Sequence, residues 1–508
     1  MKTAMHSMTS SPLTGRVSSG ARAFLLAAVA LILLITVVRA SICWTNDAEI
    51  SHAAGVIIAM AADLKDGVFY RPLFGPDGYG GTRYFPLYFS LHALLLKLGI
   101  PVLLSAYLLS AAAIILLMLG TFYLLRELRV EPWLAAGSAG ALLAAGSAQL
   151  SLVSPHPDGL ASALNVWGLA VVARPQTSQR KILLASALFT LAWSAKFTAV
   201  FGFATAFVWL LSAGFPRMAL QLAGGTFCGY LLVAGTMIFA SLGRFLEIFK
   251  ACASGGTNLM LMASGPWNMA TVAAQGDRGL FLFVFLALLA LVSSVFSANF
   301  LQNLPALFFV ATIAVTVVIF GSPGTNNNHL LDVQVAAIIL FTAWLANRAS
   351  PLQKQLGVFA LALATLAAVI PLWHHLKSWD LPYHPHRFQT VLALTGDTQR
   401  PVLAENPVIP VLGGGQPYVL DPWMVQLLRK HIPNFEKPLL EGLRNRTFGA
   451  VVLMKNPATD FGRWWYETAS FGPGFLSAVS ENYRLALVID DQRVYLPITD
   501  TSPRSRTK

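Results

Sequence analysis

Charged residues are scarce in this chain. Lys, Arg, Asp and Glu make up 11% of its 508 residues, whereas 56% are hydrophobic and the mean hydropathy is +0.62. A soluble globular domain carries about 25% charged residues, so the composition excludes a water-soluble protein. The net charge is +12. No basic cluster alternates with aromatic residues in an exposed segment, so we expect no nucleic-acid partner and place the cations in cytoplasmic loops instead.

Cysteine is also rare. Cys43, Cys228 and Cys252 have no metal-binding or redox spacing. Cys43 and Cys252 could meet on the outer face, but three scattered cysteines are usually small apolar residues. No convincing signal-peptidase site follows the first apolar run, which predicts an uncleaved membrane anchor.

Long apolar runs dominate what is present. Eleven of them are candidates to cross roughly 30 Å of hydrocarbon. They lie at 22–42, 101–123, 133–153, 159–173, 181–196, 197–213, 218–240, 279–297, 304–322, 330–347 and 355–373. The apolar stretch at 84–98 is shorter, and we expect an interfacial or re-entrant helix there. The sequence therefore predicts a mainly α, polytopic membrane protein with about eleven transmembrane helices.

Basic residues predict the orientation. If the N-terminus is inside, the cytoplasmic side holds Lys2, Arg16, Arg22, Arg126, Arg129, Arg174, Arg180, Lys181, Arg217, Arg348 and Lys354. The outer turns at 153–158 and 323–329 then hold no Lys or Arg. This asymmetry follows the positive-inside rule, and an odd number of spans places the C-terminus outside.

The tail after the last apolar run changes in composition. Short apolar runs there alternate with Pro and turn residues over ~110 residues, which predicts a small extracytoplasmic α/β domain. Strands are expected at 402–404, 418–420, 450–454 and 485–489, and helices at 424–431 and 438–443. The predicted divisions are a cytoplasmic N-terminus (1–21), a transmembrane domain (22–373) with outer loops at 43–98 and 241–278, the outer domain (374–500) and a disordered tail (501–508).

An acidic pair follows the first apolar run. Asp47 and Glu49, in Thr45-Asn46-Asp47-Ala48-Glu49, place two carboxylates at the membrane surface. Such groups are costly near a bilayer unless they pair, bind something or do chemistry. An ordinary acidic surface loop is the alternative. No cofactor is certain, although Asp-x-Glu leaves a divalent cation open, because Asp and Glu are oxygen ligands for such ions.

The next segment is rich in Arg and Tyr. His52 follows Glu49 at helical spacing, and Arg71, Arg83 and Tyr84 precede the short apolar stretch. Arg and Tyr at a membrane surface suit a phosphate head group.

Ionisable residues also interrupt the apolar runs, where they are functional candidates by default. His156 and Asp158 lie at an outer junction of two runs, where Asp also suits a helix N-cap. Lys196 stands between two further runs, with snorkelling to the surface as the alternative. Asn328 and His329 lie in a predicted outer turn, and an acidic residue follows inside the next apolar run. The alternative is an ordinary polar turn that caps the next helix.

The order of these motifs resembles the GT-C superfamily of polytopic glycosyltransferases. It is most similar to the branch of protein O-mannosyltransferases, lipid A aminoarabinose transferases and rhizobial galacturonosyltransferases. The matching elements are Asp47 with Glu49, Phe85–Phe89, Asp158–Leu160, Lys196, Asn326–Asp332, Leu403–Asn406 and Tyr418–Pro422. Two features depart from the family pattern: Ala48 separates the acids, and Tyr84-Phe85-Pro86-Leu87 replaces Lys-Pro-Pro-Leu, which leaves Arg83 as the nearest cation.

The resemblance implies sugar transfer from a polyprenyl-phosphate donor to an acceptor hydroxyl, with inversion, at the outer face of a bacterial inner membrane. The acceptor would be a glycan, a lipid or a protein. Asp47 would be the general base, Glu49 and Asp158 would orient substrates, and Arg83, Lys196 and Arg71 would bind the donor phosphate. The remaining pocket residues would be His52, Tyr84, His156, Asn328 and His329.

Two other function classes stay open at this stage. Intramembrane Asp, Lys and His also occur in transporters, although the chain has no paired halves with broken helices. A lipid-linked-glycan ligase or an assembly protein is the third class. An enzyme should bring Asp47, Asp158 and Lys196 into one outer cavity, roofed by 71–86 and 255–268.

Overall fold

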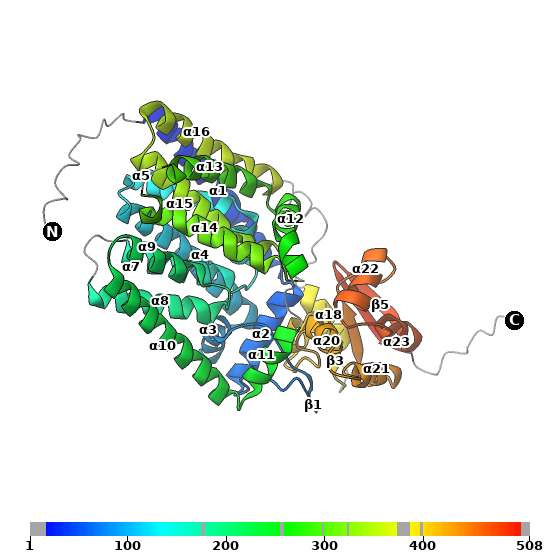
Figure 1. The fold of residues 1–508 in the computed structure, drawn as a ribbon. Helices are drawn as coiled ribbons and strands as arrows, with labels where there is room; N and C mark the ends of the chain where they lie inside the picture. Colours follow the sequence, from blue (N-terminus) through cyan, green and yellow to red (C-terminus); the bar gives the residue numbers. More distant parts are fainter. Residues whose placement is uncertain are drawn as a thin grey trace.

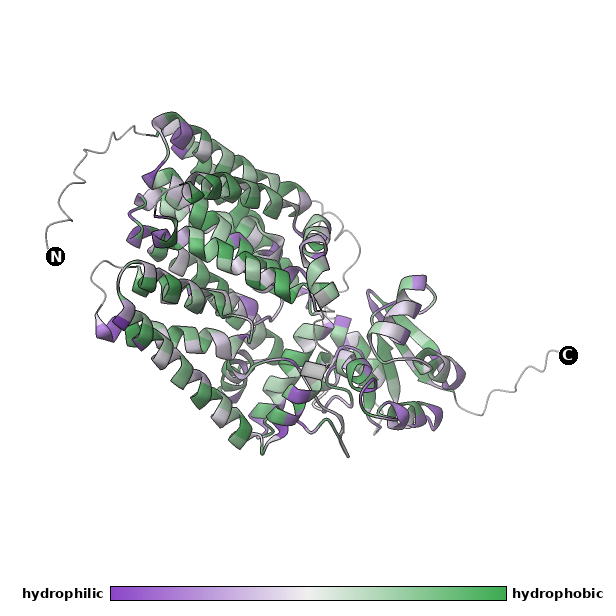
Figure 2. Cartoon of the chain, viewed as in Figure 1, coloured by the Kyte–Doolittle hydropathy of each residue, from purple (hydrophilic) through white to green (hydrophobic). Residues whose placement is uncertain are grey.

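The computed structural model describes residues 17–173, 178–254, 259–296, 299–322, 325–372, 387–396 and 400–498. A large helical bundle carries a smaller domain of helices and strands at one end (Figure 1). Hydrophobic residues run along the bundle helices, and hydrophilic residues gather at the helix ends and in the smaller domain (Figure 2). The predicted mainly α, polytopic architecture with a small α/β domain is confirmed; the name outer domain is kept for residues 387–498, and their side of the membrane stays a prediction. The predicted tail at 501–508 and most of the N-terminal segment at 1–21 lie outside the described residues.

Five helices of the described chain are long and apolar enough to cross a membrane, or six spans if one bent pair counts as one. They are α1 (Ser19–Thr45), α4 (Val102–Glu127), α10 (Pro216–Ala240), α15 (Leu331–Asn347, preceded by η3, Asn327–Leu330) and α16 (Pro351–Ala367). Many of their large apolar side chains point outward; Leu34 is 61% exposed and Leu232 72%. Lipid tails are as apolar as these side chains, so this exposure fits a membrane-embedded bundle.

Each of the eleven predicted runs contains a helix. The shorter ones are α7 (Asp158–Val172), α8 (Gln179–Ala195), α9 (Phe201–Ser212), α13 (Arg278–Val295) and α14 (Leu304–Ile319). The predicted outer loops are themselves largely helical. They hold α2 (His52–Lys65), α3 (Pro86–Lys97), α11 (Arg244–Ser254), α12 (Leu259–Gly276) and a two-stranded hairpin of β1 (Phe74–Gly75) and β2 (Gly78–Tyr79).

The third run differs from the continuous segment expected at 133–153. It folds as α5 (Pro132–Ala141), η1 (Leu142–Ala144) and α6 (Gly146–Val153), with a bend of 76°. Side chains satisfy the backbone groups that the break frees. Gln149 donates to the Leu143 carbonyl at 2.7 Å, and Asp277 accepts from the Ser147 backbone at 3.2 Å. Irregular backbone inside a membrane protein is tolerated where protein partners replace the lost bonds.

The outer domain holds a four-stranded sheet of order β3-β4-β6-β5. β3 (Val402–Ala404) pairs parallel to β4 (Ala450–Leu453), and β6 (Gln492–Pro497) pairs antiparallel to both β4 and β5 (Tyr483–Ile489). The helices of this domain are α18 (Arg387–Thr395), α19 (Val408–Leu412), α20 (Pro422–Leu428), α21 (Lys437–Arg444), α22 (Asp460–Trp464), the π-helix η4 (Trp465–Ala469) and α23 (Phe475–Asn482).

Two strand predictions need correction. Residues 418–420 do not join the sheet; Val419 forms an isolated bridge with Tyr79 of the β1–β2 hairpin. The Tyr79 N–H donates to the Tyr418 carbonyl at 2.7 Å, and the Leu420 N–H donates to the Tyr79 carbonyl at 2.9 Å. β6 was not predicted at all. Strand propensity identifies an extended segment but not its partner, because the partner is chosen by tertiary packing.

The outer domain and the bundle share a core. One cluster of buried residues joins Ile50, Ile58 and Tyr107 of the bundle side to Phe388, Val408 and other residues of the outer domain. Asn406 fixes the junction, because its side-chain amide donates to the Ile50 carbonyl at 2.8 Å. Gly55 is required opposite it, since a Cβ there would lie 1.9 Å from Asn406 Oδ1. The docked domain therefore covers the end of the bundle where the predicted site residues lie.

Candidate functional site

Lys196 is the centre of a buried charged cluster. It follows the last residue of α8, where the chain becomes extended. Its Nζ donates to Asp158 Oδ1 at 2.6 Å and lies 3.8 Å from Asp332 Oδ2. All three side chains are at most 9% exposed. The ends of α7, α8 and α15 therefore converge on one ammonium group shared by two carboxylates.

Neighbouring polar residues complete this cluster. Asn328 donates to Asp158 Oδ2 at 3.0 Å, and Ser162, one turn along α7 from Asp158, donates to Asp332. His329 interacts electrostatically with Asp158 and Lys196. Because a buried charge is stable only when it is paired and hydrogen-bonded, these contacts hold the carboxylates in fixed positions.

Histidines surround the cluster in their neutral form. Burial lowers the pKa of His156, although Asp158 opposes the shift. Burial also lowers the pKa of His52 to about 4, with Lys455, Arg83 and His156 acting in the same direction. A neutral imidazole carries one hydrogen-bond donor and one acceptor, so these rings are suited to bind hydroxyl groups.

Arg83 is the exposed cation of this region. Its guanidinium lies over the Trp423 ring, 5.4 Å from the ring centroid. The buried Asp421 and the half-buried Tyr84 are its electrostatic neighbours, and burial raises the pKa of both groups. Arg83 also acts electrostatically on His329 and His52, so it belongs to the same region as the Lys196 cluster. An exposed guanidinium in such a place suits an incoming phosphate.

The acidic pair lies in a tight turn after α1. Asp47 and Glu49 have φ angles of 51° and 62°, and Ala48 between them is 1% exposed. Asp tolerates this left-handed conformation better than most residues do. The turn buries the small Ala48 side chain, and both acids remain partly exposed. Backbone strain of this kind gathers at functional sites.

The two acids have different surroundings. Glu49 Oε1 lies 3.7 Å from Nη2 of Arg39, which is buried in α1 and donates to Gln149 at 3.3 Å. The Asp47 carbonyl accepts from Arg387 at 3.1 Å, and Asp47 acts electrostatically on Tyr107. Glu49 is thus an ion-pair partner for a membrane-helix arginine, whereas the Asp47 turn is held through its backbone.

Helix α4 connects the acidic turn with the Lys196 cluster. Tyr107 donates to the Ala48 carbonyl at 3.5 Å. Ser110, about 4.5 Å further along the helix axis, donates to the Ser154 carbonyl at 3.4 Å and lies 2.9 Å from the Tyr88 hydroxyl. The Ser154 loop leads into Asp158, so both groups contact neighbouring turns of one helix.

Arg71 lies in a separate, closed ion pair. Its Nε and Nη2 donate to the two Asp63 oxygens at 2.6 and 2.5 Å, and its Nη1 donates to the Pro417 carbonyl at 2.7 Å. Burial raises the pKa of Asp63 even though Arg71 opposes the shift. The guanidinium links α2 to the outer domain, so this geometry does not support the phosphate-binding role predicted for Arg71.

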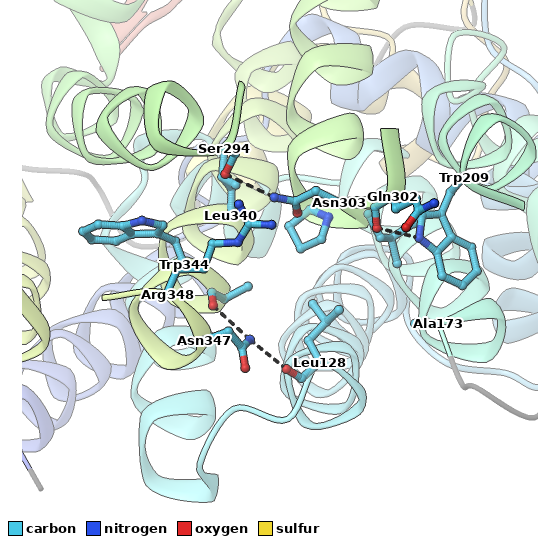
Figure 3. A pocket seen from close by; sticks show the side chains of 13 residues that line it. Leu128, Ala173, Trp209, Ser294, Gln302, Asn303, Leu340, Trp344, Asn347 and Arg348 are labelled. Carbon is cyan, nitrogen blue, oxygen red and sulfur yellow. Dashed lines mark hydrogen bonds between the residues drawn. The ribbon is translucent and has the colours of Figure 1, made fainter. Parts of the chain in front are cut away.

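The described cavities do not coincide with the predicted one. A cavity of about 250 Å³ lies at the other end of the bundle, lined by Trp209, Asn303, Asn347 and Arg348 among others (Figure 3). Its amide side chains bond to neighbours, as Asn303 does to Ser294 and Asn347 to Leu128. A second cavity of about 10 Å³ lies beside Asp63 and Arg71. Neither is lined by Asp47, Asp158 or Lys196, and part of the predicted roof, 255–258, lies outside the described residues.

Sequence reasoning missed several contributors. Asp332 was identified only as the acid ending a turn, although its place near the start of an apolar helix is itself a signal. Ser162 has the i+4 spacing that places it on the same helix face as Asp158. Arg39 is a charge inside the first apolar run; its partner Glu49 lies ten residues further on, but its second partner, Gln149, comes from a distant segment. Among the described residues, no group of three or more His, Cys, Asp and Glu could hold a metal ion.

Comparisons with known proteins identify the architecture. The sequence matches no family model and no curated protein. Its structure is similar to the oligosaccharyltransferase of Archaeoglobus fulgidus (TM-score 0.53, 11% identity, 95% of this chain and 75% of that one). It is also similar to ArnT of Cupriavidus metallidurans bound to undecaprenyl phosphate (0.53, 12%, 93% and 99%) and to the mycobacterial arabinofuranosyltransferase AftD (0.50, 15%, 94% and 42%). The chain therefore has the GT-C fold, the polytopic architecture of these membrane glycosyltransferases.

Proposed function

We propose that this protein transfers a sugar from a polyprenyl-phosphate donor to an acceptor hydroxyl, with inversion, at the membrane surface beneath its outer domain. The observation that carries the proposal is the Lys196 cluster. In a chain with the GT-C fold, three helix ends place Lys196, Asp158 and Asp332 together, and the exposed Arg83 acts electrostatically on His329 in the same region. The similarity to ArnT, whose structure contains undecaprenyl phosphate, supports a lipid-linked donor.

The proposed reaction is a displacement in which the leaving phosphate carries away negative charge. The acceptor oxygen attacks the anomeric carbon while the bond from that carbon to the phosphate oxygen breaks. The phosphate leaves with the electron pair, and one displacement inverts the anomeric centre. Arg83 would bind the leaving phosphate from the accessible side and Lys196 from the buried side; preorganised donors of this kind contribute about 3–4 kcal/mol each.

Asp47 would be the general base that takes the acceptor proton, because it lies in a strained turn directly after α1, where the resemblance places the base. Asp158 would fix the geometry through its bonds to Lys196 and Asn328, and Glu49 through its ion pair with Arg39. His52, Tyr84, His156 and His329 would contact the sugar and acceptor hydroxyls.

A donor-consumption assay tests the proposal. Purified protein is incubated with a panel of polyprenyl-phosphate sugars and candidate acceptors, and released polyprenyl phosphate is measured. We expect one pair to give product with inverted anomeric configuration. Arg348→Gln, at the far cavity, is the matched control for Lys196→Gln and should keep full activity. Consumption that is equal in both variants, or product with retained configuration, would overturn the proposal.

A further inference from the structure

An exposed aromatic platform lies on the outer domain, and the function proposed above does not use it. It consists of Phe461, Trp464 and Trp465. Their ring centroids are 5.8 Å apart for Phe461–Trp464, 6.2 Å for Phe461–Trp465 and 6.4 Å for Trp464–Trp465. The side chains of Phe461 and Trp464 are 56% and 51% exposed. Large apolar residues clustered on a surface mark a binding site more often than scattered ones do.

One ring of the platform, Trp465, is held in place by a hydrogen bond. Trp465 Nε1 donates to Glu405 Oε1 at 2.8 Å. The other Glu405 oxygen accepts from the Tyr466 hydroxyl at 2.5 Å and from the Met454 N–H at 2.6 Å. Trp465 begins the π-helix η4, a local irregularity that is frequent at functional sites. The indole orientation is thus fixed before any ligand arrives, which lowers the entropy cost of binding.

The inner end of the platform reaches the candidate site. Trp465 packs edge-on against His52, with ring centroids 5.6 Å apart. His52 in turn interacts electrostatically with Arg83, His156 and Lys455. A molecule lying on Phe461 and Trp464 would therefore have its next unit at His52, beside the groups proposed to carry out transfer.

We infer that the Phe461–Trp464–Trp465 platform is the binding subsite for a carbohydrate acceptor. This inference rests on the proposed function and specifies its acceptor as a glycan chain rather than a lipid or a protein. A sugar ring has an apolar C–H face that packs on flat aromatic rings and a rim of hydroxyls. Polar partners for that rim stand beside the platform, because Arg463 and Asp460 form an exposed ion pair on α22.

The position of the platform favours a glycan over the bilayer. The Asp460 side chain is 98% exposed, and a carboxylate is costly to immerse in hydrocarbon. Figure 1 shows α22 on the outer domain, off the end of the helical bundle. A lipid-linked donor must approach the site from the membrane. The acceptor can therefore approach from the other side, across the outer domain.

A binding measurement tests the inference without requiring catalysis. Full-length purified protein is titrated, in the absence of donor, with a panel of defined neutral and acidic hexasaccharides while tryptophan fluorescence is recorded. We expect at least one hexasaccharide to bind, and Trp464→Ala and Phe461→Ala each to weaken it roughly tenfold. Phe296→Ala, which removes an 86% exposed aromatic ring at the C-terminal end of α13, is the control and should bind normally.

The outcomes separate this inference from the proposed function. With an active donor–acceptor pair, Trp464→Ala should raise the acceptor KM roughly tenfold and leave kcat and the donor KM unchanged. Hexasaccharide binding without any transfer would retain the subsite and overturn the proposed function. Transfer with an unchanged acceptor KM in Trp464→Ala would overturn the subsite. So would weaker binding of the two variants to anionic phospholipid vesicles with no hexasaccharide binding, since that result identifies a membrane contact.

Discussion

Two buried ion pairs in this protein look alike in sequence and differ in structure. Arg71–Asp63 and Lys196–Asp158 each join a cation to an aspartate at 2.5–2.6 Å, and each partner is at most 9% exposed. The Arg71 pair is closed, because one guanidinium meets both oxygens of one carboxylate and one backbone carbonyl. The Lys196 pair is open, because a second carboxylate, Asp332, shares the ammonium.

The difference shows how a structural pair can be told from a site. The closed pair holds one charge of each sign, and its guanidinium links α2 to the outer domain. The open cluster carries two acids for one buried cation, and His156, His329 and Arg83 are its electrostatic neighbours. Two buried acids that share one cation inside a membrane protein are a stronger indication of a functional site than a balanced pair is.

The largest effect on turnover should come from a change at Asp47, the proposed general base, which is part of neither the Arg71 pair nor the Lys196 cluster. Asp47→Asn is nearly isosteric and keeps the backbone bond to Arg387. We expect turnover to fall roughly 10²–10⁴-fold, because Asn cannot accept the acceptor proton. Donor turnover and thermal unfolding should be measured together, with the exposed Asp66→Asn as control. Near-normal turnover of Asp47→Asn would contradict this prediction, and Asp158 or Glu49 would then be the candidate base.

Breaking the closed pair should affect stability rather than chemistry. Arg71→Met leaves the Asp63 charge buried without its cation, and we expect a loss of about 3–5 kcal/mol in the free energy of unfolding. The activity of the remaining folded protein should be close to that of the wild type. Asp63→Leu with Arg71→Met should recover much of the stability in denaturant titrations. A specific loss of donor affinity in Arg71→Met would restore its predicted phosphate role.

Breaking the open pair should affect chemistry even when the fold is rescued. Lys196→Met with Asp158→Asn and Asp332→Asn leaves none of the three buried charges of the cluster without a partner, so the protein should fold. We expect kcat/KM to remain lower by roughly 10²–10³-fold, because the buried donor to the phosphate is missing. Single-turnover assays on folded protein provide the measurement. If this triple variant were active, Lys196 would be as structural as Arg71.

Arg83 should behave as a binding residue at the edge of the open cluster. Its contact with the donor phosphate would exist in both the ground and transition states, so Arg83→Ala should raise the donor KM. Loss of a charge-assisted hydrogen bond predicts roughly a 10- to 100-fold change. Arg463→Ala, an exposed arginine on α22, is the control. An unchanged donor KM would remove Arg83 from the donor site.

The smallest effect is the pH dependence of stability that His52 contributes. Burial lowers the pKa of His52 to about 4 in the folded protein, below its ordinary value of 6.5. The unfolded chain therefore binds more protons, so His52 makes stability fall as pH decreases from 6.5 toward 4. Between pH 7.5 and 5.5 we expect His52 to account for about 1 kcal/mol of the loss in unfolding free energy, and His52→Gln should reduce the total loss by that amount. Equal slopes of unfolding free energy against pH in the wild type and in His52→Gln would contradict this prediction.

The positions of the helices and several residues of the charged cluster could be predicted from the sequence. Each of the eleven apolar runs contains a helix, and Asp158, Lys196 and Asn328 were all identified before their contacts were known. Both results depend on properties summed along a short stretch of chain. An apolar run has to be helical in a membrane, because every backbone group must bond within the segment. A charged residue inside such a run is costly, so it is a candidate functional residue.

The tertiary structure alone decided what those charges do. Arg71 and Lys196 gave similar signals in sequence, but only packing showed that Asp63 closes the first pair and that Asp332 opens the second. The same holds for residues 418–420, which pair with the Tyr79 hairpin and not with the sheet. Hydrophobicity is read locally along the chain, whereas the partner of a buried charge or a strand depends on which distant segments meet. Burial makes that choice decisive, because an unpaired charge or backbone group there is costly.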